Sequence, residues 1–372
     1  MLRMLGLRIA RAIAVLVAVS LGTFSLIALS PGDPAATILG TTATPAEVAY
    51  LDQQLGVNQP WPDRYWHWVT GAVQGNFGLS LVPPRQSVAQ MLGQAVPVTA
   101  EIVVIALVLG LIFGIALGAW AAHRQDQAAD RIITAGSFAL ISVPAFVLGL
   151  LLAILLVFHP TWVRVLVLAA GLVIAGRALS SASQRKPLLV RRPGRGALVL
   201  AAVATAIGVL GFLFIPAFPR FGWTPITTSL AGNLRFAFLP ALTLTLGLIP
   251  LFAQVLRADM VQTLQQNFIV VARAKGMSEL HIIFREALRP SLFSLVTVLG
   301  LSIGALLAGS VVVENIFGLP GLGSVLLNAI TSKNYSVVQA GVLLIALVFL
   351  IVNLLVDIAY AYLDPRTRRA AN

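Results

Sequence analysis

The chain has 372 residues, of which 58% are hydrophobic and only 10% are charged, and its formal net charge is +12. Soluble proteins carry about 25% charged residues, so this composition excludes a conventional soluble globule, and a disordered chain would need the opposite balance. The basic residues are scattered between long apolar runs and form no single basic face, which argues against a nucleic-acid-binding protein. The chain contains no cysteine, which excludes disulfide bonds, thiolate metal sites and cysteine nucleophiles.

Long apolar runs predict an all-α fold, a polytopic transmembrane helical bundle. A bilayer core about 30 Å thick requires roughly 20 mostly apolar residues in a helix. The first run is longer than the apolar core of a signal peptide and precedes no small-x-small cleavage site, so we interpret it as a retained helix. The predicted spans are residues 10–29, 98–122, 132–158, 161–179, 197–215, 237–256, 290–313 and 336–360, of which 161–179 is the weakest.

The distribution of Lys and Arg predicts the orientation, because short cytoplasmic loops carry an excess of these residues. With the N-terminus inside, most of the 25 basic residues fall in cytoplasmic segments, and the C-terminus is cytoplasmic as well. The cations of residues 177–196 would lie outside unless the chain crosses the membrane twice between the third span and 237–256. We therefore expect eight spans, which are a six-span core and an extra two-helix hairpin.

These spans divide the chain into segments in a fixed order. The predicted segments are 1–29 (N-terminal tail and first transmembrane helix), 30–97 (extracytoplasmic helical segment), 98–158 (second and third transmembrane helices), 159–222 (inserted hairpin with a basic cytoplasmic loop), 223–257 (outer loop and transmembrane helix), 258–289 (cytoplasmic segment) and 290–372 (last two transmembrane helices and basic tail).

The extracytoplasmic segment carries a helix signal and an aromatic cluster. A capping box at residues 44–47 predicts a short helix over 45–55, with Gly56 as its stop. Aromatic rings of this kind either anchor a segment at the lipid headgroups or form a docking surface for an external partner. The cluster comprises Trp61, Tyr65, Trp66 and Trp68.

The sequence carries no recognisable catalytic or metal site. Its four histidines have no paired spacing, and no nucleotide-binding or nucleophile motif occurs. The deepest acid of an apolar run is Asp357, one helical turn after Asn353. Because Asp357 is close to the cytoplasmic end of its run, we favour an interfacial hydrogen-bonding role over a proton relay.

The predicted cytoplasmic segment 258–289 contains clear helix-capping signals. Residues 258–275 favour a helix, and Gly276 supplies its stop. Ser278 is a suitable N-cap for a second helix with Glu279 in its first turn, and Pro290 then opens the next span. The apolar run 268–271 invites a protein partner, although an ordinary solvated hairpin fits the capping equally well.

Taken together, several short stretches resemble one family, the membrane-spanning permeases of binding-protein-dependent ABC importers, and most closely its dipeptide/oligopeptide/nickel branch. Residues 272–276 with 287–289 resemble the branch's version of the EAA loop, which docks on the ATPase. Val270 and Val271 depart from the loop's usual acid and first alanine, and the insert 160–222 has no counterpart in the common six-span plan. Further similar stretches are 31–34, 55–56, 75–78, 142–146, 314–317, 320–323, 353–357 and 363–366.

The resemblance implies roles for particular residues. It implies an ATPase-coupling role for the segment 258–289, hereafter the coupling segment, through Val271, Ala272, Arg273, Ala274, Lys275, Gly276, Ser278, Glu286, Ala287 and Leu288. It implies an outer-loop motif at Glu314, Phe317, Pro320, Gly321 and Gly323, and it leaves Pro144, Asn353 and Asp357 as structural or unassigned positions.

The implied function is ATP-driven import by alternating access, with this chain as one half of a pore in the cell membrane. The implied partners are a second permease (a different chain or a second copy), two ATPase subunits that carry the ATP and Mg²⁺, an extracytoplasmic solute-binding protein and the lipid bilayer, with no nucleic acid. No cofactor is expected on this chain. The implied cargo is a di- or oligopeptide or a related small solute such as a nickel complex.

The alternatives are a polytopic membrane enzyme, an ion-coupled carrier and an assembly factor that docks through the basic loop. An enzyme or a carrier would place polar groups at mid-membrane, where this sequence has few.

Overall fold

The structure is a computed structural model that describes residues 2–28, 44–46, 48–49, 52, 59–82, 85–183, 195–214, 218–219 and 221–363. Among these residues the regular structure is helical, apart from one isolated bridge between Leu79 and Ser87, and this confirms the all-α prediction. The chain divides into two compact units: unit 1 comprises Met1–Phe146 with Pro240–Asn372, and unit 2 comprises Val147–Leu239.

The described helices confirm a polytopic membrane protein, with fewer spans than predicted. Six described helices are long and apolar enough to cross a membrane. Helix α6 (Ala128–Ile141) and the helical stretch Ala145–Phe158 add a seventh span if the two are counted as one. The predicted span 197–215 is α9 (Arg195–Phe214), whose apolar part Leu198–Leu213 is shorter than a span requires. The six helices that are long and apolar enough to cross a membrane are Arg8–Ser25, Val88–His123, Pro160–Ser180, Leu230–Leu264, Glu279–Phe317 and Tyr335–Val356.

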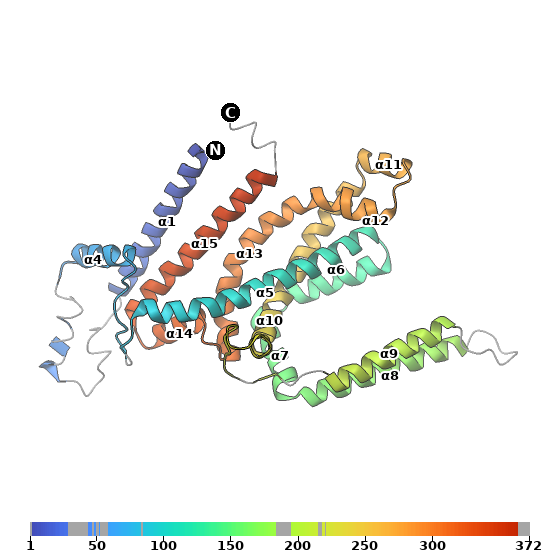
Figure 1. The fold of residues 1–372 in the computed structure, drawn as a ribbon, viewed down its shortest axis with the longest axis horizontal. Helices are drawn as coiled ribbons and strands as arrows, with labels where there is room; N and C mark the ends of the chain where they lie inside the picture. Colours follow the sequence, from blue (N-terminus) through green and yellow to red (C-terminus); the bar gives the residue numbers. More distant parts are fainter. Residues whose placement is uncertain are drawn as a thin grey trace. The chain divides into compact units, whose positions relative to one another are not determined.

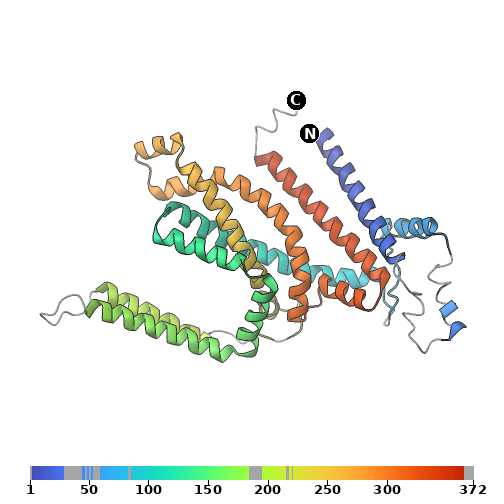
Figure 2. The same ribbon diagram turned by 180° about the vertical axis from the view of Figure 1, so that it is seen from behind.

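Unit 1 is a bundle of long helices with short helices at its two ends. Helix α13 packs against α5, α14 and α15, and α1 lies along α15 (Figures 1 and 2). The start of α1, the end of α15 and α11 lie toward one end of the unit, and α4 and α14 lie toward the other (Figure 1). The helices are α1 (Leu2–Ala28), α4 (Trp61–Val73), α5 (Val88–His123), α6, α10 (Leu230–Leu264, in this unit from Pro240), α11 (Asn267–Ala274), α12 (Glu279–His281), α13 (Leu288–Phe317), α14 (Leu322–Thr331) and α15 (Tyr335–Leu363).

Glycines let α5 and α10 approach closely. A Cβ at Gly118 would come within 2.7 Å of the Ala253 carbonyl oxygen, and one at Gly114 within 2.6 Å of the Phe252 Cβ. Gly110, one turn earlier on the same face, contacts α10 as well. Small residues at every fourth position allow backbones to pack closely in a membrane, where no hydrophobic force drives helices together. This contact fixes the C-terminal half of α5 on α10.

Helix α5 begins ten residues before the apolar run from which its span was predicted. Val88, Leu92 and Ala95 are buried against α14 and α15, and this burial extends the helix past the apolar run and through Pro97. Residues 88–97 thus belong to a helix of the bundle, although hydropathy alone assigns them to the extracytoplasmic segment.

Most of the aromatic cluster packs against α1. The rings of Trp61 and Tyr65 stack at 5.7 Å, and both lie edge-on to Phe24 of α1. The Tyr65 hydroxyl lies 2.8 Å from the Ser20 hydroxyl, whereas Trp66 is 66% exposed. Most of the cluster therefore ties α4 to α1, and Trp66 remains available to lipid or a partner. Of the helix predicted over 45–55, residues 45–46, 48–49 and 52 are helical, and Glu47, Gly56 and the similar stretches 31–34 and 55–56 lie outside the described residues.

Unit 2 contains the predicted hairpin, formed by α8 (Pro160–Ser183) and α9. A Cβ at Gly171 would come within 2.6 Å of the Ala204 carbonyl oxygen, and Gly208 lies opposite. Alanines of both helices complete the contact, while large apolar side chains such as Val173 and Ile207 are exposed. The hairpin is held together by small residues, as is typical of membrane helices. Its predicted basic loop, residues 184–194, lies outside the described residues.

Candidate functional site

The first part of the coupling segment is the end of α10 followed by α11. The predicted helix over 258–275 is broken at Gln265 and Gln266, so α10 ends at Leu264 and α11 begins at Asn267. Gly276 has a φ of +77°, its N–H donates to the Arg273 carbonyl at 2.9 Å, and the Met277 N–H donates to the Ala272 carbonyl at 3.3 Å. These paired bonds form a Schellman motif, which confirms Gly276 as the helix stop.

The second part begins at Ser278, whose side chain accepts the His281 N–H at 3.4 Å and so caps α12 as predicted. Glu279 accepts a hydrogen bond from the Arg273 Nε at 3.2 Å across the turn. One helical turn later the chain widens into a π-helical stretch, Ile282–Ala287, before α13. Pro290 cannot donate a backbone hydrogen bond, and local widening of a helix is one way to accommodate a proline.

One face of the coupling segment is buried against the ends of α5 and α10. Ala272 and Ala287, both predicted to couple to the ATPase, lie on this buried face, where they pack against the cluster. The buried cluster comprises Ala119 and Ala122 of α5, Leu256 of α10 just before the coupling segment, and Met260, Ile269, Ala272, Ile282, Ile283 and Ala287 of the coupling segment.

The opposite face is exposed and carries large apolar side chains among charged ones. Val271 is 51% exposed and Leu280 69% exposed. A groove of about 760 Å³ opens beside them, lined by Phe268, Phe284, Arg285, Glu286, Leu288, Arg289, Pro290 and Leu292. Glu286 also faces His281, with 3.8 Å between its Oε1 and the His281 Nε2. The predicted coupling residues Arg273, Ala274, Lys275, Gly276 and Ser278 are exposed as well.

At the other end of unit 1, the outer-loop motif closes around Glu314. This carboxylate is fully buried, and its Oε1 accepts the Thr99 hydroxyl at 2.6 Å. Its Oε2 accepts the backbone N–H groups of Gly323 at 2.8 Å and Ser324 at 3.1 Å. The Leu322 N–H donates to the Thr99 hydroxyl at 2.8 Å. The first N–H groups of α14 are therefore satisfied by side chains of α13 and α5, and the carboxylate lies at the favourable end of the helix dipole.

The motif glycines are required by this packing. A Cβ at Gly321 would overlap the Glu314 carboxylate, and one at Gly323 would overlap the Val311 backbone. Phe317 is buried beneath the turn, and Pro320 is exposed. The structure thus brings Glu314, Gly321 and Gly323 into one site.

A second polar network, which sequence reasoning missed, holds the other end of α14. The buried Asn334 side chain donates to the Ser80 hydroxyl at 2.7 Å and accepts the Leu81 N–H at 3.1 Å. Lys333, just before it, has a φ of +54°. No local pattern links residues this far apart in the chain, although asparagine in a loop between apolar runs is a weak signal of such a bond.

The remaining predicted positions are structural. Pro144 lies at the break between α6 and α7 (Ala145–Leu152), where the residue before a proline disfavours helix. Asn353 is partly buried on α15, and the Asp357 side chain, like the similar stretch beyond Leu363, lies outside the described residues. Among the described side chains, the buried acids are Glu314 and Asp130, at the ends of their helices.

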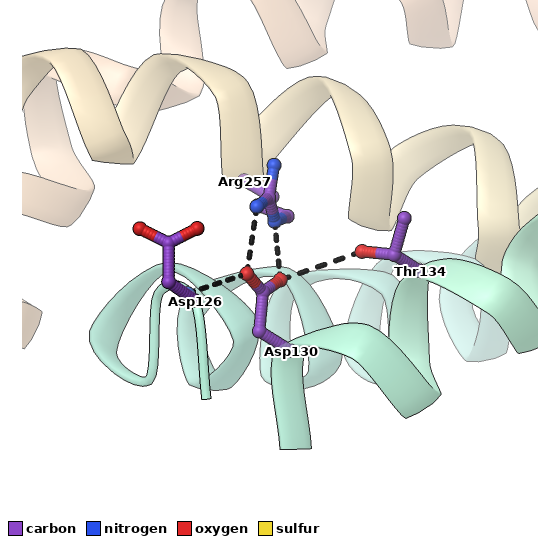
Figure 3. Close-up of polar contacts among 4 residues, drawn as sticks. All are labelled: Asp126, Asp130, Thr134 and Arg257. Carbon is purple, nitrogen blue, oxygen red and sulfur yellow. Dashed lines mark hydrogen bonds and ion pairs between the residues drawn. The ribbon is translucent and has the colours of Figure 1, made fainter. Parts of the chain in front are cut away.

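Asp130 forms an ion pair that the sequence analysis missed. It is 3% exposed in the first turn of α6, and it accepts two hydrogen bonds from Arg257 of α10 (Figure 3). The distances are 2.5 Å from Nε to Oδ1 and 2.7 Å from Nη2 to Oδ2. Both residues stand where an apolar run meets a charged segment, which hides the pairing among ordinary flanking charges.

Comparisons with known proteins cover the whole chain. The family described as "Binding-protein-dependent transport system inner membrane component" matches residues 189–369, and the N-terminal part of such components matches residues 1–111. A probable peptide ABC transporter permease protein, y4tP of Sinorhizobium fredii, is 30% identical over 97% of both chains. The glutathione transport system permease protein GsiC of Escherichia coli K12 is 32% identical, over 98% of this chain and 97% of its own.

These relatives are transporter subunits and not enzymes, which sets aside the alternative of a membrane enzyme. Together with the membrane-spanning bundle, the matches identify the chain as a multi-pass inner-membrane protein. The chain belongs to the family of inner-membrane permeases of binding-protein-dependent ABC importers, within its peptide-transporting branch.

Proposed function

We propose that this chain forms one half of the pore of an ATP-driven importer and that its coupling segment docks on an ATPase subunit. The observation that carries the proposal is the division of that segment into two faces. One face is buried against α5 and α10. The other face has exposed apolar side chains around the groove at Phe268 and Phe284. An exposed apolar patch of this kind marks a protein contact.

The mechanism follows from the rigidity of this arrangement. Closure of the ATPase subunits on ATP displaces the coupling segment, and the buried cluster transmits that displacement to α5 and α10 as near-rigid bodies. A loaded solute-binding protein at the opposite end biases the same equilibrium, so the coupling between the two ends is reciprocal. Substrate transfer then requires no catalytic residue on this chain.

The proposed orientation places both termini and the coupling segment in the cytoplasm. Three arginines precede the first span, and the coupling segment is rich in Arg and Lys, as cytoplasmic segments are. The start of α1 and the end of α15 lie toward the same end of unit 1 as α11 (Figure 1). The α14 end, with Glu314, is then extracytoplasmic.

The proposed partners are a second permease, two ATPase subunits that bind the ATP and Mg²⁺, and an extracytoplasmic solute-binding protein. No cofactor is proposed on this chain. The named relatives transport peptides or glutathione, which supports a small peptide as the cargo. A nickel complex stays an untested alternative.

One experiment tests the assembly. The chain is tagged, expressed in its native membrane and purified in a mild detergent, and the co-purifying proteins are identified by mass spectrometry. We expect a second permease and ATPase subunits at stoichiometric amounts, and ATP hydrolysis that a solute-binding protein with its ligand stimulates. Purification of the chain without ATPase subunits from membranes that contain them would contradict the proposal.

A further inference from the structure

The Asp130–Arg257 pair joins α6 to α10, and both α10 and α5, the helix that precedes α6, contribute residues to the cluster that holds the coupling segment. Arg257 lies on α10 directly after Leu256 and one turn before Met260, both of which are buried in the cluster that holds the coupling segment. Neighbouring helical residues point about 100° apart, so α10 contacts α6 through one side and the coupling segment through another. The end of α10 is therefore fixed on both sides.

Asp130 also determines the shape of the turn between α5 and α6. Its Oδ2 accepts the Asp126 N–H at 3.0 Å, and its Oδ1 lies 3.4 Å from the Thr134 hydroxyl (Figure 3). Asp126 has a φ of +62°, a conformation that a non-glycine residue keeps only when its surroundings hold it. Arg124 closes the same turn with a hydrogen bond to Gln127 at 3.2 Å.

The geometry of the Asp130–Arg257 pair is better suited to positioning α6 relative to α10 than to raising the stability of the fold. A buried ion pair adds little net stability over apolar residues of similar size. A bidentate arginine–carboxylate pair, however, fixes both the distance and the relative orientation of the two groups. A pair of this kind resists rotation of α10 against α6, which a single-point apolar contact would allow.

We propose that Asp130 and Arg257 are positioning residues that make the α5–α6 turn, the end of α10 and the coupling segment move as one body. Force from the ATPase then reaches α5 and α6 as well as α10. This inference rests on the proposed ATPase docking. It adds a residue pair outside the coupling segment that decides whether docking produces transport.

The test separates docking from transmission in the purified complex. Asp130→Asn keeps the shape of the side chain, and Arg257→Gln removes the guanidinium. Two quantities are measured in proteoliposomes, the amount of ATPase subunit that co-purifies and the solute transported per ATP hydrolysed. We expect normal co-purification and continued hydrolysis, with transport per ATP lowered by about tenfold or more.

Further variants identify the pair as the cause. The double variant Asp130→Asn/Arg257→Gln should be no worse than the single variants, because both remove one interaction. Arg257→Lys should retain an intermediate ratio, since it keeps the charge and loses the bidentate fork. Arg131→Gln is the matched control on an exposed side chain next to Asp130, and it should transport like the parent.

Three results would overturn the inference: an unchanged transport-to-hydrolysis ratio in both single variants, additive losses in the double variant, or loss of the ATPase subunits from the variants but not from the parent. The last result would make the pair a folding or docking element. If the parent itself binds no ATPase, the proposed function fails instead.

Discussion

The Glu314 carboxylate occupies the space in which a side chain at Gly321 would have to lie. The two residues come from opposite sides of the turn between α13 and α14, so the buried carboxyl group at the N-terminus of α14 requires glycine at position 321. This relationship gives a physical reason for the acid and the glycine of the outer-loop motif in this chain.

The first prediction is that Gly321→Ala destabilises the outer end of unit 1. The added methyl group must displace the carboxylate or the turn, and overpacking of this kind costs about 1–3 kcal/mol. The thermal unfolding midpoint of the detergent-purified chain should fall. Gly247→Ala is the matched control, because a Cβ at Gly247 in α10 meets nothing within 4 Å. An equal midpoint for both variants would contradict the packing described for Glu314.

The second prediction concerns Thr99, which donates to Glu314 and accepts from the Leu322 N–H. Thr99→Val keeps the size of the side chain but leaves two buried polar groups without their partner, which costs about 1–3 kcal/mol for each group. Chemical denaturation in detergent should show the loss. Thr70→Val is the control, since the exposed Thr70 hydroxyl bonds only to carbonyls of its own helix and its removal should change the free energy of unfolding little.

The sequence predicts this fold where local chemistry decides the outcome. Gly276 and Ser278 are predicted as helix stop and helix cap, and both are confirmed, because caps depend on residues only a few positions apart. The helical bundle is predicted for a similar reason, since a run of about 20 apolar residues needs little context.

Prediction from the sequence fails where the structure depends on contacts between residues that are far apart in the chain. The early start of α5 at Val88 depends on burial against α14 and α15, which hydropathy does not contain. The Asp130–Arg257 pair joins residues that lie far apart in the sequence, and no local sequence pattern links them. Of the buried acids among the described side chains, Glu314 is named in the sequence analysis only through the family resemblance and Asp130 is not named at all, because burial depends on neighbouring helices.

The third prediction is that Gly276→Val abolishes transport while the chain still inserts and accumulates. A side chain at a φ of +77° costs roughly 1 kcal/mol, and a β-branched one costs more, although a Cβ there meets no atom within 4 Å. That strain is too small to unfold the bundle, but it disrupts the Schellman motif and misdirects α12. Gly276→Asn should retain transport, because asparagine tolerates the left-handed conformation. Membrane abundance and solute uptake are measured for both, and equal uptake by the valine and asparagine variants would contradict the prediction.

The fourth prediction contrasts two neighbours on the coupling segment. Val271 is half-exposed and Ala272 is buried, so an aspartate has different effects at the two positions. Val271→Asp should leave the chain stable and weaken ATPase binding, because the complex would bury an unpaired carboxylate at a cost of about several kcal/mol. Ala272→Asp should instead lower the abundance of the chain, because the charge enters the cluster with Leu256. Immunoblots of membranes and co-purification distinguish the effects, and a Val271→Asp variant that binds ATPase like the parent removes this residue from the interface.

The fifth prediction fixes the orientation of the hairpin. The cations of residues 177–196 favour a cytoplasmic position for the end of α8, where Ser180 is exposed. The chain contains no cysteine, so Ser180→Cys introduces a single thiol. A membrane-impermeant thiol reagent should leave it unlabelled in intact cells and label it after the membrane is opened. Gln74→Cys, at the exposed end of α4 on the proposed outer side, should be labelled in both conditions and so reports that the reagent reaches the outer surface. Labelling of Ser180→Cys in intact cells would place the end of α8 outside and leave the hairpin without its two proposed crossings.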